Sequence, residues 1–212
     1  MWAAAVALLA IITGCFRGLL AVHSALGIAA VALACFYARR HRAARIAVVL
    51  GIVECALRGP IIHACLSPVF FAACAAIGVK PSSHRVRWMI QSIPLLVFFQ
   101  IVLGAAYRHK AIGVMPHMAG ALLVAGLLLG VSMTAWQRYA LKAAGALLAI
   151  VLLQVSLGIA VFTMRILDAE ATGFFVAADV AHITVGSLTL AVATILVLVI
   201  PDPSPRAQDS KP

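Results

Sequence analysis

Charged residues are scarce in this sequence, and their scarcity excludes a soluble fold. Lys, Arg, Asp and Glu make up 10% of the 212 residues, whereas an average soluble domain carries about 25%. Hydrophobic residues make up 65%, and the mean hydropathy is +1.12. So few polar side chains cannot cover a globular core. The composition therefore predicts an integral membrane protein whose apolar helices contact membrane lipid.

Acidic residues are the rarest charged class, which leaves a strong positive excess. Six Asp and Glu stand against 16 Lys and Arg, and the formal net charge is +10. The basic residues lie in short gaps between apolar runs, so they indicate membrane topology and no nucleic-acid partner. Cytoplasmic loops of membrane proteins are enriched in Lys and Arg.

Cysteine motifs are also missing. No Cys-x-x-Cys pair and no Cys/His spacing typical of a zinc site occurs in the sequence. We expect the five cysteines to be small buried hydrophobic residues. They are Cys15, Cys35, Cys55, Cys65 and Cys74.

No basic residue precedes the first apolar run. That run ends in Ile-Thr-Gly-Cys at residues 12–15, which resembles a lipoprotein cleavage site. A signal peptide carries a positively charged region before its apolar core. We therefore expect this segment to be retained as the first helix.

Breaks within the apolar blocks predict eight membrane-spanning helices. Residues 46–79 would form a helix of about 51 Å, against a hydrocarbon core of about 30 Å, and residues 1–38 are longer still. Arg17-Gly18 interrupts the first block and Arg58-Gly59-Pro60 the second. Proline starts a helix well and ends the preceding one. The expected spans are 2–16, 19–38, 46–58, 60–79, 88–107, 117–136, 143–164 and 175–200.

The distribution of charge favours eight spans over six. With eight spans and a cytoplasmic N-terminus, 11 basic residues lie inside and five outside, as the positive-inside rule requires. With six spans, Arg17 and Arg58 fall in the middle of the membrane and the others divide evenly. The five outer residues are Arg17, Arg58, Arg108, Lys110 and Arg165.

The two halves of the chain share an internal repeat. The motif Gln-x-x-Leu-Gly occurs at 100–104 and again at 154–158, and Glu54-x-x-Leu57 begins a degraded copy. Histidines recur in the same order in the alternate helices of both halves. The repeat predicts two pseudo-symmetric four-helix bundles, residues 1–79 and 88–200, followed by a polar cytoplasmic tail, 201–212.

Four of the seven histidines lie near the outer end of an even-numbered helix: His23, His63, His117 and His182. A single imidazole in a membrane helix usually forms a hydrogen bond to a neighbouring helix, but four at one depth indicate a functional site. Facing helices can offer two imidazoles to one octahedral iron. We expect His23 to pair with His63 and His117 to pair with His182.

Heme suits these pairs better than zinc, because no third or fourth ligand lies at the same depth. The two propionates of a heme would favour the basic residues of the outer level. The candidate cofactor-binding residues are Arg17, Arg58, Arg108, His109, Lys110 and Arg165.

The stretch 99–109, with His117 opening the next helix, resembles the heme A synthase family, as does 153–158 followed by His182. The resemblance implies a membrane oxidoreductase that oxidises the methyl group of heme O to the formyl group of heme A. It further implies heme b on the C-terminal histidine pair and the substrate heme in the N-terminal half. A heme O synthase or respiratory oxidase subunits would then be partners. We expect the protein in a bacterial plasma membrane, and the charge distribution predicts that both termini are cytoplasmic.

The family carries a Glu-x-x-His arrangement that is not present before His23 or His117. An oxidation through charged intermediates needs a positioned acid or base, and the nearest candidates are Glu54 and Asp179. A b-type cytochrome that only transfers electrons is the alternative on the same scaffold. A transporter or a structural subunit would leave the four histidines unexplained.

Overall fold

The computed structural model describes residues 1–57, 59–82, 88–170 and 172–201. Regular structure within these residues is helical, with no strand. The helices are α1 (Trp2–Gly14), the 3-10 turn η1 (Arg17–Leu19), α2 (Leu20–Ala38), α3 (Arg42–Ala56), α4 (Pro60–Ala75), α5 (Trp88–Gln91), α6 (Ile93–Arg108), α7 (Val114–Tyr139), α8 (Lys142–Ile166) and α9 (Gly173–Val199).

The helix breaks predicted inside the two long apolar blocks are confirmed. In the first block, α1 ends at Gly14, and η1 leads into α2. In the second block, α3 ends at Ala56 and α4 begins at Pro60, which occupies the first helical position. Proline suits this position because its missing N–H would have no partner inside the helix.

Several predicted boundaries were wrong: α4 ends at Ala75 instead of 79, and α7 extends beyond 117–136 at both ends. Two further differences have a clear physical reason. The gap 39–45 was expected to be a loop, but α3 begins at Arg42 after an extended His41. Arg and Ala are strong helix formers, so the helix begins before the apolar run does. The predicted helix 88–107 is divided between α5 and α6, with Ser92 between them. Pro94, at the start of α6, cannot donate the hydrogen bond that would continue α5.

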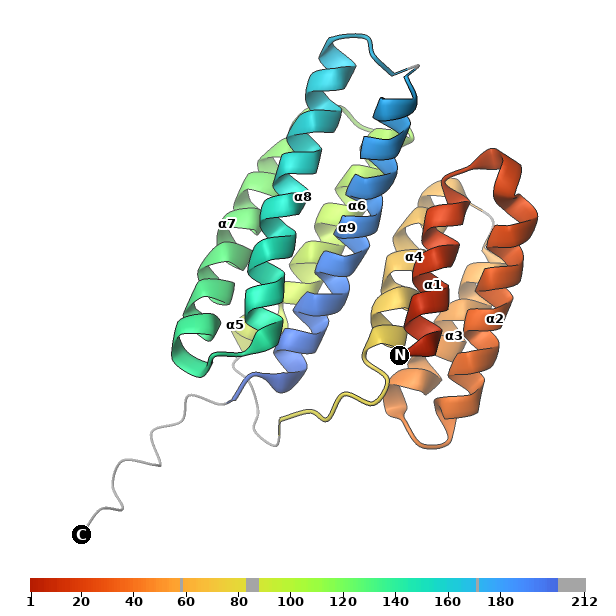
Figure 1. The fold of residues 1–212 in the computed structure, drawn as a ribbon, viewed down its shortest axis with the longest axis vertical. Helices are drawn as coiled ribbons and strands as arrows, with labels where there is room; N and C mark the ends of the chain where they lie inside the picture. The colour runs from red at the N-terminus through yellow and green to blue at the C-terminus, as the bar shows by residue number, and fades with distance from the viewer. Residues whose placement is uncertain (58, 83–87, 171, 202–212) are drawn as a thin grey trace.

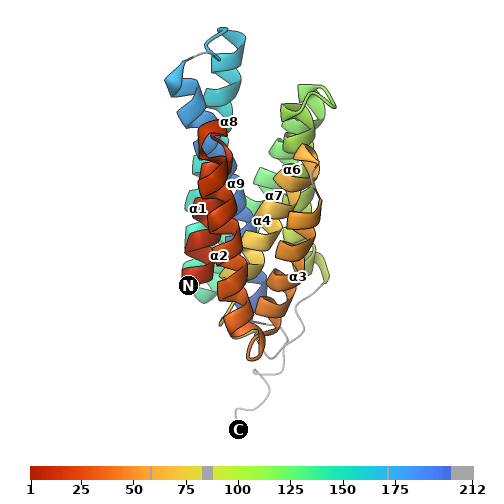
Figure 2. The ribbon, with the colours of Figure 1, turned by 90° about the vertical axis from the view of Figure 1, so that its right-hand side faces the viewer.

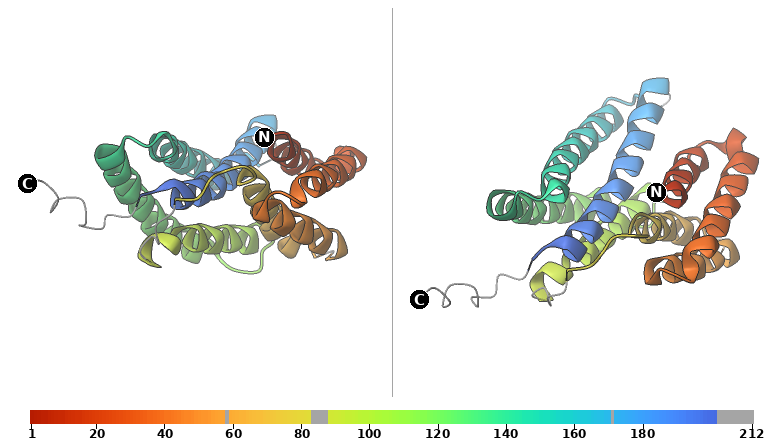
Figure 3. Two further views of the ribbon diagram at one scale, coloured as in Figure 1. Left: turned by 90° about the horizontal axis from the view of Figure 1, so that it is seen from below. Right: turned by 60° about the horizontal axis from the view of Figure 1, so that its bottom comes forward.

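Consecutive long helices run antiparallel and form two groups, as Figures 1 and 2 show. In the first group, α1 packs on α2 and α4, and α3 packs on α2 and α4. In the second group, α6 packs on α7 and α9, and α8 packs on α7 and α9. The two groups meet where α4 packs against α9 and α6, as the view from below in Figure 3 shows.

One end of the assembly is called the histidine end here, because all four candidate histidines lie toward it. It is the upper end in Figure 1, where α1, α3, α6 and α8 finish and α2, α4, α7 and α9 begin. The N-terminus and the described C-terminal end of α9 lie toward the opposite end (Figure 1).

Small residues fill much of the core. Ala30, Ala34, Ala44 and Ala47 are fully buried where α2 packs against its neighbours. Small side chains let helix backbones approach closely, which is typical of helix packing in membranes.

The outside of the assembly is apolar. Phe36 and Leu122 are both 78% exposed, and Ile28 is 66% exposed. An apolar exterior of this extent is incompatible with water. Four helices, α2, α7, α8 and α9, are long and apolar enough to cross a membrane. The chain is therefore an all-α membrane protein.

Candidate metal centre in two histidine pairs

His23 and His63 point at each other from α2 and α4. Their Nε2 atoms lie 3.2 Å apart, and their rings are nearly perpendicular, at 82°. On the far side of each ring, His23 Nδ1 lies 2.8 Å from the carbonyl oxygen of Ala10, and His63 Nδ1 lies 3.3 Å from Glu54 Oε1. Each Nδ1 therefore has an acceptor, which leaves both Nε2 lone pairs directed into the space between the rings.

Glu54 is held between two elements of the first group. Its carboxylate accepts a hydrogen bond from the Ser67 hydroxyl and contacts the ring of His63, and its side chain is only 11% exposed. Ser67 Oγ also lies 2.9 Å from the carbonyl oxygen of His63, one turn earlier in α4. The sequence-predicted acid therefore lies directly beside the first histidine pair.

A cavity of about 580 Å³ lies between α1, α2, α3 and α4. Both histidines of the first pair, Glu54 and Ser67 line it, and most of the other lining side chains are apolar. An apolar cavity of this size with a few convergent polar groups is typical of a cofactor or ligand site.

His117 and His182 form the second pair, from α7 and α9. Their ring centroids lie 6.5 Å apart, with the rings at 86°. Gln100 Nε2 lies 2.9 Å from His117 Nδ1 and donates to the carbonyl oxygen of His117 at 2.8 Å. Gln154 Nε2 lies 3.4 Å from His182 Nε2. A glutamine from a neighbouring helix thus contacts each histidine of this pair.

Three polar atoms around the second pair are buried without a hydrogen-bond partner in the described part of the chain. They are Gln100 Oε1, Gln154 Oε1 and His182 Nδ1. Leaving a buried donor or acceptor unpaired costs about 1–3 kcal/mol each. Clustered groups of this kind are expected where a protein binds something besides its own side chains.

Glycines bring three of the histidine rings against the backbone of a neighbouring helix. A Cβ atom at Gly14 would lie 2.9 Å from His23 Nδ1. Equivalent atoms at Gly104 and Gly158 would lie 3.0 and 3.1 Å from Cε1 of His117 and of His182. Any side chain at these positions would displace the ring.

These glycines and glutamines are site residues that the sequence analysis missed as such. From the sequence, the repeated Gln-x-x-Leu-Gly motif indicates an internal repeat but no contact with a histidine. Its glutamine and glycine are four residues apart, so they lie on one face of a helix. In both copies this face contacts a histidine of the next helix, which explains the spacing of the motif.

Asp179, the second candidate acid, is paired with a cation. Its Oδ2 lies 3.3 Å from Arg108 Nη2 at the end of α6, and the thiol of Cys15 lies beside the same guanidinium. This contact joins α9, α6 and the end of α1 at the histidine end.

The remaining outer basic residues divide into two groups. Arg165 lies over the rings of Tyr107 and Phe175, at 5.1 and 5.6 Å, and its Nε is 3.2 Å from Glu170 Oε1 without hydrogen-bond geometry. Its partner Tyr107 stacks on His117, with ring centroids 6.4 Å apart. Arg165 is thus connected to the second pair through one aromatic ring.

His109 and Lys110 are exposed after the end of α6, and Lys110 has a left-handed backbone with φ 60°. Both lie at the histidine end, as the sequence predicted. The side chain of Arg17 and the whole of Arg58 lie outside the described residues.

No group of three or more His, Cys, Asp or Glu that could hold a metal ion occurs among the described residues. A zinc site needs three or four protein ligands. A heme supplies most of its own iron coordination, so a pair of imidazoles is sufficient.

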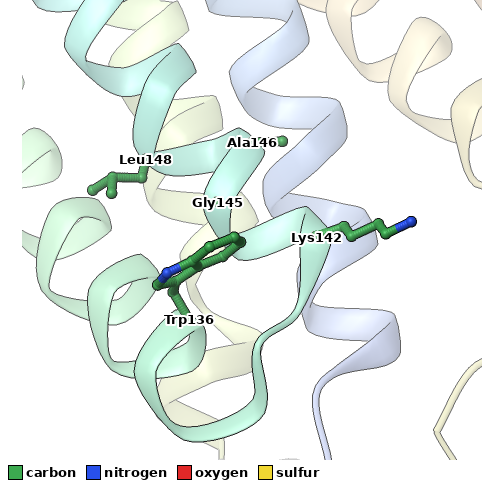
Figure 4. Close-up of a pocket in the computed structure, with 5 residues that line it drawn as sticks. All are labelled: Trp136, Lys142, Gly145, Ala146 and Leu148. Atoms are coloured by element: carbon green, nitrogen blue, oxygen red, sulfur yellow. The ribbon is translucent and has the colours of Figure 1, made fainter.

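A second hollow, of about 490 Å³, lies at the opposite end of the second group (Figure 4). Trp136 and Lys142 flank the turn between α7 and α8 there, and the Trp136 ring lies against Gly145. No histidine lines it in the described chain, so it is separate from the two pairs.

No known family model and no curated protein matches this sequence. A functional assignment therefore rests on the geometry of the two histidine pairs and on the motif resemblance.

Proposed function

We propose that the chain is a membrane oxidoreductase of the heme A synthase type, with one heme held by His23 and His63 and another by His117 and His182. One observation carries the proposal. Four helices place two pairs of facing imidazoles toward the same end of the assembly, and both rings of the first pair have an acceptor on Nδ1. A ligating histidine needs such a group to orient its ring and fix its tautomer.

The residues of the first group fit a heme. The first pair opens into a cavity whose lining is apolar apart from a few polar groups, as a porphyrin requires. In the second group, the amides of Gln100 and Gln154 would have to move away from His117 Nδ1 and His182 Nε2 before these rings could bind iron. The second pair is surrounded by buried polar atoms that lack partners among the described residues. The close approach of histidines to Gly14, Gly104 and Gly158 places flat rings between closely packed helices.

In this proposal the four long helices and the shorter helices α1, α3, α4 and α6 all span the membrane, as two pseudo-symmetric bundles with cytoplasmic termini. The charge distribution supports this arrangement, and so does the position of the N-terminus and of the end of α9 toward one side in Figure 1. The 13-residue helix α1 would measure about 20 Å. Bilayer thinning around the first bundle would accommodate it.

The two bundles would have different roles. Glu54 and Ser67 line the first cavity, so we assign the substrate, heme O, to His23 and His63. The second pair has no comparable acid, because the carboxylate of Asp179 contacts Arg108. We therefore assign heme b, as an electron relay, to His117 and His182.

The reaction converts a methyl group and one water molecule into a formyl group, and releases four electrons and four protons. The bound hemes would supply the redox chemistry and pass the electrons to an external acceptor. Glu54 lines the same cavity beside His63, so its carboxylate would accept a proton released in the reaction. The apolar lining of the cavity would limit the access of other water molecules.

The propionates of the hemes would lie at the histidine end. Arg108, Arg165, His109 and Lys110 are located there, and Arg17 and Arg58 belong to the same level in the sequence. Guanidinium groups bind carboxylates with paired, charge-assisted hydrogen bonds. A heme O synthase or subunits of a respiratory oxidase would deliver the substrate or accept the product.

The second candidate function is a b-type membrane cytochrome that transfers electrons without oxidising its heme. One observation favours it: both candidate acids already have partners, Glu54 with Ser67 and His63, and Asp179 with Arg108. A carboxylate with these partners can serve structure alone.

Identification of the bound heme separates the two functions. The full chain would be purified from cells that also produce heme O, and its heme would be extracted and identified by pyridine hemochrome spectrum and mass. The synthase function requires heme O, a hydroxylated intermediate or heme A on the protein. Heme b alone would leave the cytochrome, and a protein without heme would contradict both.

A further inference from the structure

The cavity of the first group has walls of unequal exposure. Two walls belong to α1 and α4, where the lining residues Ala7, Ala10 and Phe70 are buried. These two helices also pack against α9 of the second group. The other two walls belong to α2 and α3, which lie on the side away from the second group in Figure 1. The cavity therefore has a covered back and a front formed by α2 and α3.

Several residues on this front line the cavity and are exposed at the same time. On α2, Leu20 is 68% exposed and Ile28 is 66% exposed, and the exposed Ser24 lies between them on the same helix face. On α3, Cys55 also lines the cavity and is exposed. Residues that border a cavity and also reach the surface mark its opening. The cavity therefore has a mouth between α2 and α3.

Two glycines explain where this mouth begins. Gly51 of α3 is buried, and a Cβ atom there would collide with Val31 of α2 and lie 3.2 Å from the ring of Phe70. Gly27 lines the cavity one turn nearer the histidine end than Val31. No described atom outside the adjacent backbone of its own helix lies within 4 Å of its Cβ position. The two helices thus touch at Gly51 and leave open space from Gly27 toward the histidine end.

The mouth faces lipid and leads to polar groups inside. Helix α2 is long and apolar enough to cross a membrane, and the exposed Leu20 and Ile28 are side chains that suit contact with lipid. The polar lining groups His23, His63 and Glu54 contact one another within the cavity. A ligand that enters here must be largely apolar and must carry a centre that imidazole can bind.

We propose that the first cavity is filled sideways from the membrane, through the mouth between α2 and α3, with heme as the ligand. The inference rests on the proposed function, which assigns the substrate heme to His23 and His63. A porphyrin has a large apolar ring, and transfer of apolar surface from water into lipid is favourable. The membrane would therefore concentrate heme at the mouth. The ring would reach the two imidazoles without passing through the outer loops.

The rates of heme uptake and release test the proposal. The full chain would be reconstituted in phosphatidylcholine vesicles, heme b added, and uptake followed by the low-spin spectrum. Release would be followed by transfer to excess apomyoglobin, and His63→Ala would identify the signal of the first pair. The variants Ser24→Trp and Cys55→Trp narrow the mouth. Cys35→Trp is the matched control, because Cys35 is exposed on α2 and lies outside the lining of the cavity.

Both mouth variants should slow uptake and release by about tenfold or more. A narrowed entrance raises the same barrier in both directions, so the dissociation constant and the heme content at saturation should stay at the wild-type values. Cys35→Trp should change neither rate. A residue that only contacts bound heme would change the dissociation constant instead.

The outcomes separate this inference from the proposed function. A wild-type chain without any heme signal that depends on His63 would overturn both. Heme on the first pair with unchanged rates in the mouth variants would overturn only the inference, because heme would then enter elsewhere. Equal slowing in Cys35→Trp, or faster release with unchanged uptake in the mouth variants, would overturn it as well. If one mouth variant fails to fold, the other decides alone.

Discussion

Gly104→Ala should displace His117 and cost the second bundle its heme. The added Cβ would lie 3.0 Å from Cε1 and 3.3 Å from Nδ1 of His117. Ordinary carbon contacts are about 3.5–4.0 Å, so the ring must move by about 0.5 Å or more. Tyr107 stacks on the ring and Gln100 contacts its Nδ1, so the movement breaks a contact that fixes the ring.

The expected change in stability is small, and the expected change in heme binding is large. Overpacking of a core costs about 1–3 kcal/mol. Replacing Gly by Ala inside a helix returns up to about 1 kcal/mol. The free energy of unfolding should therefore fall by about 2 kcal/mol or less. Loss of the group that orients a ligand weakens metal binding by about 10–100-fold.

Heme content per chain, measured by pyridine hemochrome after purification, tests this prediction. Gly126→Ala in α7 is the matched control, because no described atom outside the adjacent backbone of its own helix lies within 4 Å of its Cβ position. The control should retain the wild-type heme content and gain slight stability. A Gly104→Ala protein that keeps its full heme content and its low-spin spectrum would refute the reasoning.

Three further predictions concern the other contacts. Glu54→Gln should keep the heme content within twofold and reduce the formation of heme A by about 10²–10⁴-fold; unchanged formation would exclude Glu54 as the acid. Arg108→Gln should leave Asp179 unpaired and lower the free energy of unfolding by only about 1 kcal/mol, because the arginine is partly exposed. Adding Asp179→Asn should restore part of the lost stability, as measured by thermal unfolding. Gly145→Ala should lower the unfolding temperature by displacing the ring of Trp136, with no loss of heme.

The sequence predicted the helix order because the breaks depend on local chemistry. Pro60 and the glycines near the outer turns interrupt the apolar blocks through local backbone chemistry, whatever other helices those blocks pack against. The expected pairing of His23 with His63 also agrees with the geometry, since helices in sequence order and of similar length bring their ends together. The start of α3 could not be predicted from charge, because the basic residues before the apolar run are themselves strong helix formers.

The contacts around the histidines could not be predicted in the same way. Asp179 lies one turn before His182, so the sequence placed its carboxylate at that ring, but it pairs with Arg108 of another helix. Glu54 contacts His63 only because α3 and α4 are rotated so that these two side chains face each other. Helix rotation depends on the packing of many small side chains, which a single sequence with nearly uniform hydrophobicity does not reveal.

The number of hemes bound by single and double histidine variants tests the central claim most directly. The full chain would be saturated with heme b, and its heme content measured per chain together with the low-spin spectrum of the reduced protein. Two hemes are expected for the wild type and for His41→Ala, and one each for His63→Ala and His182→Ala. The double variant, which carries both His63→Ala and His182→Ala, should bind none. Heme retained by the double variant, or lost equally in His41→Ala, would contradict the assignment of the two histidine pairs.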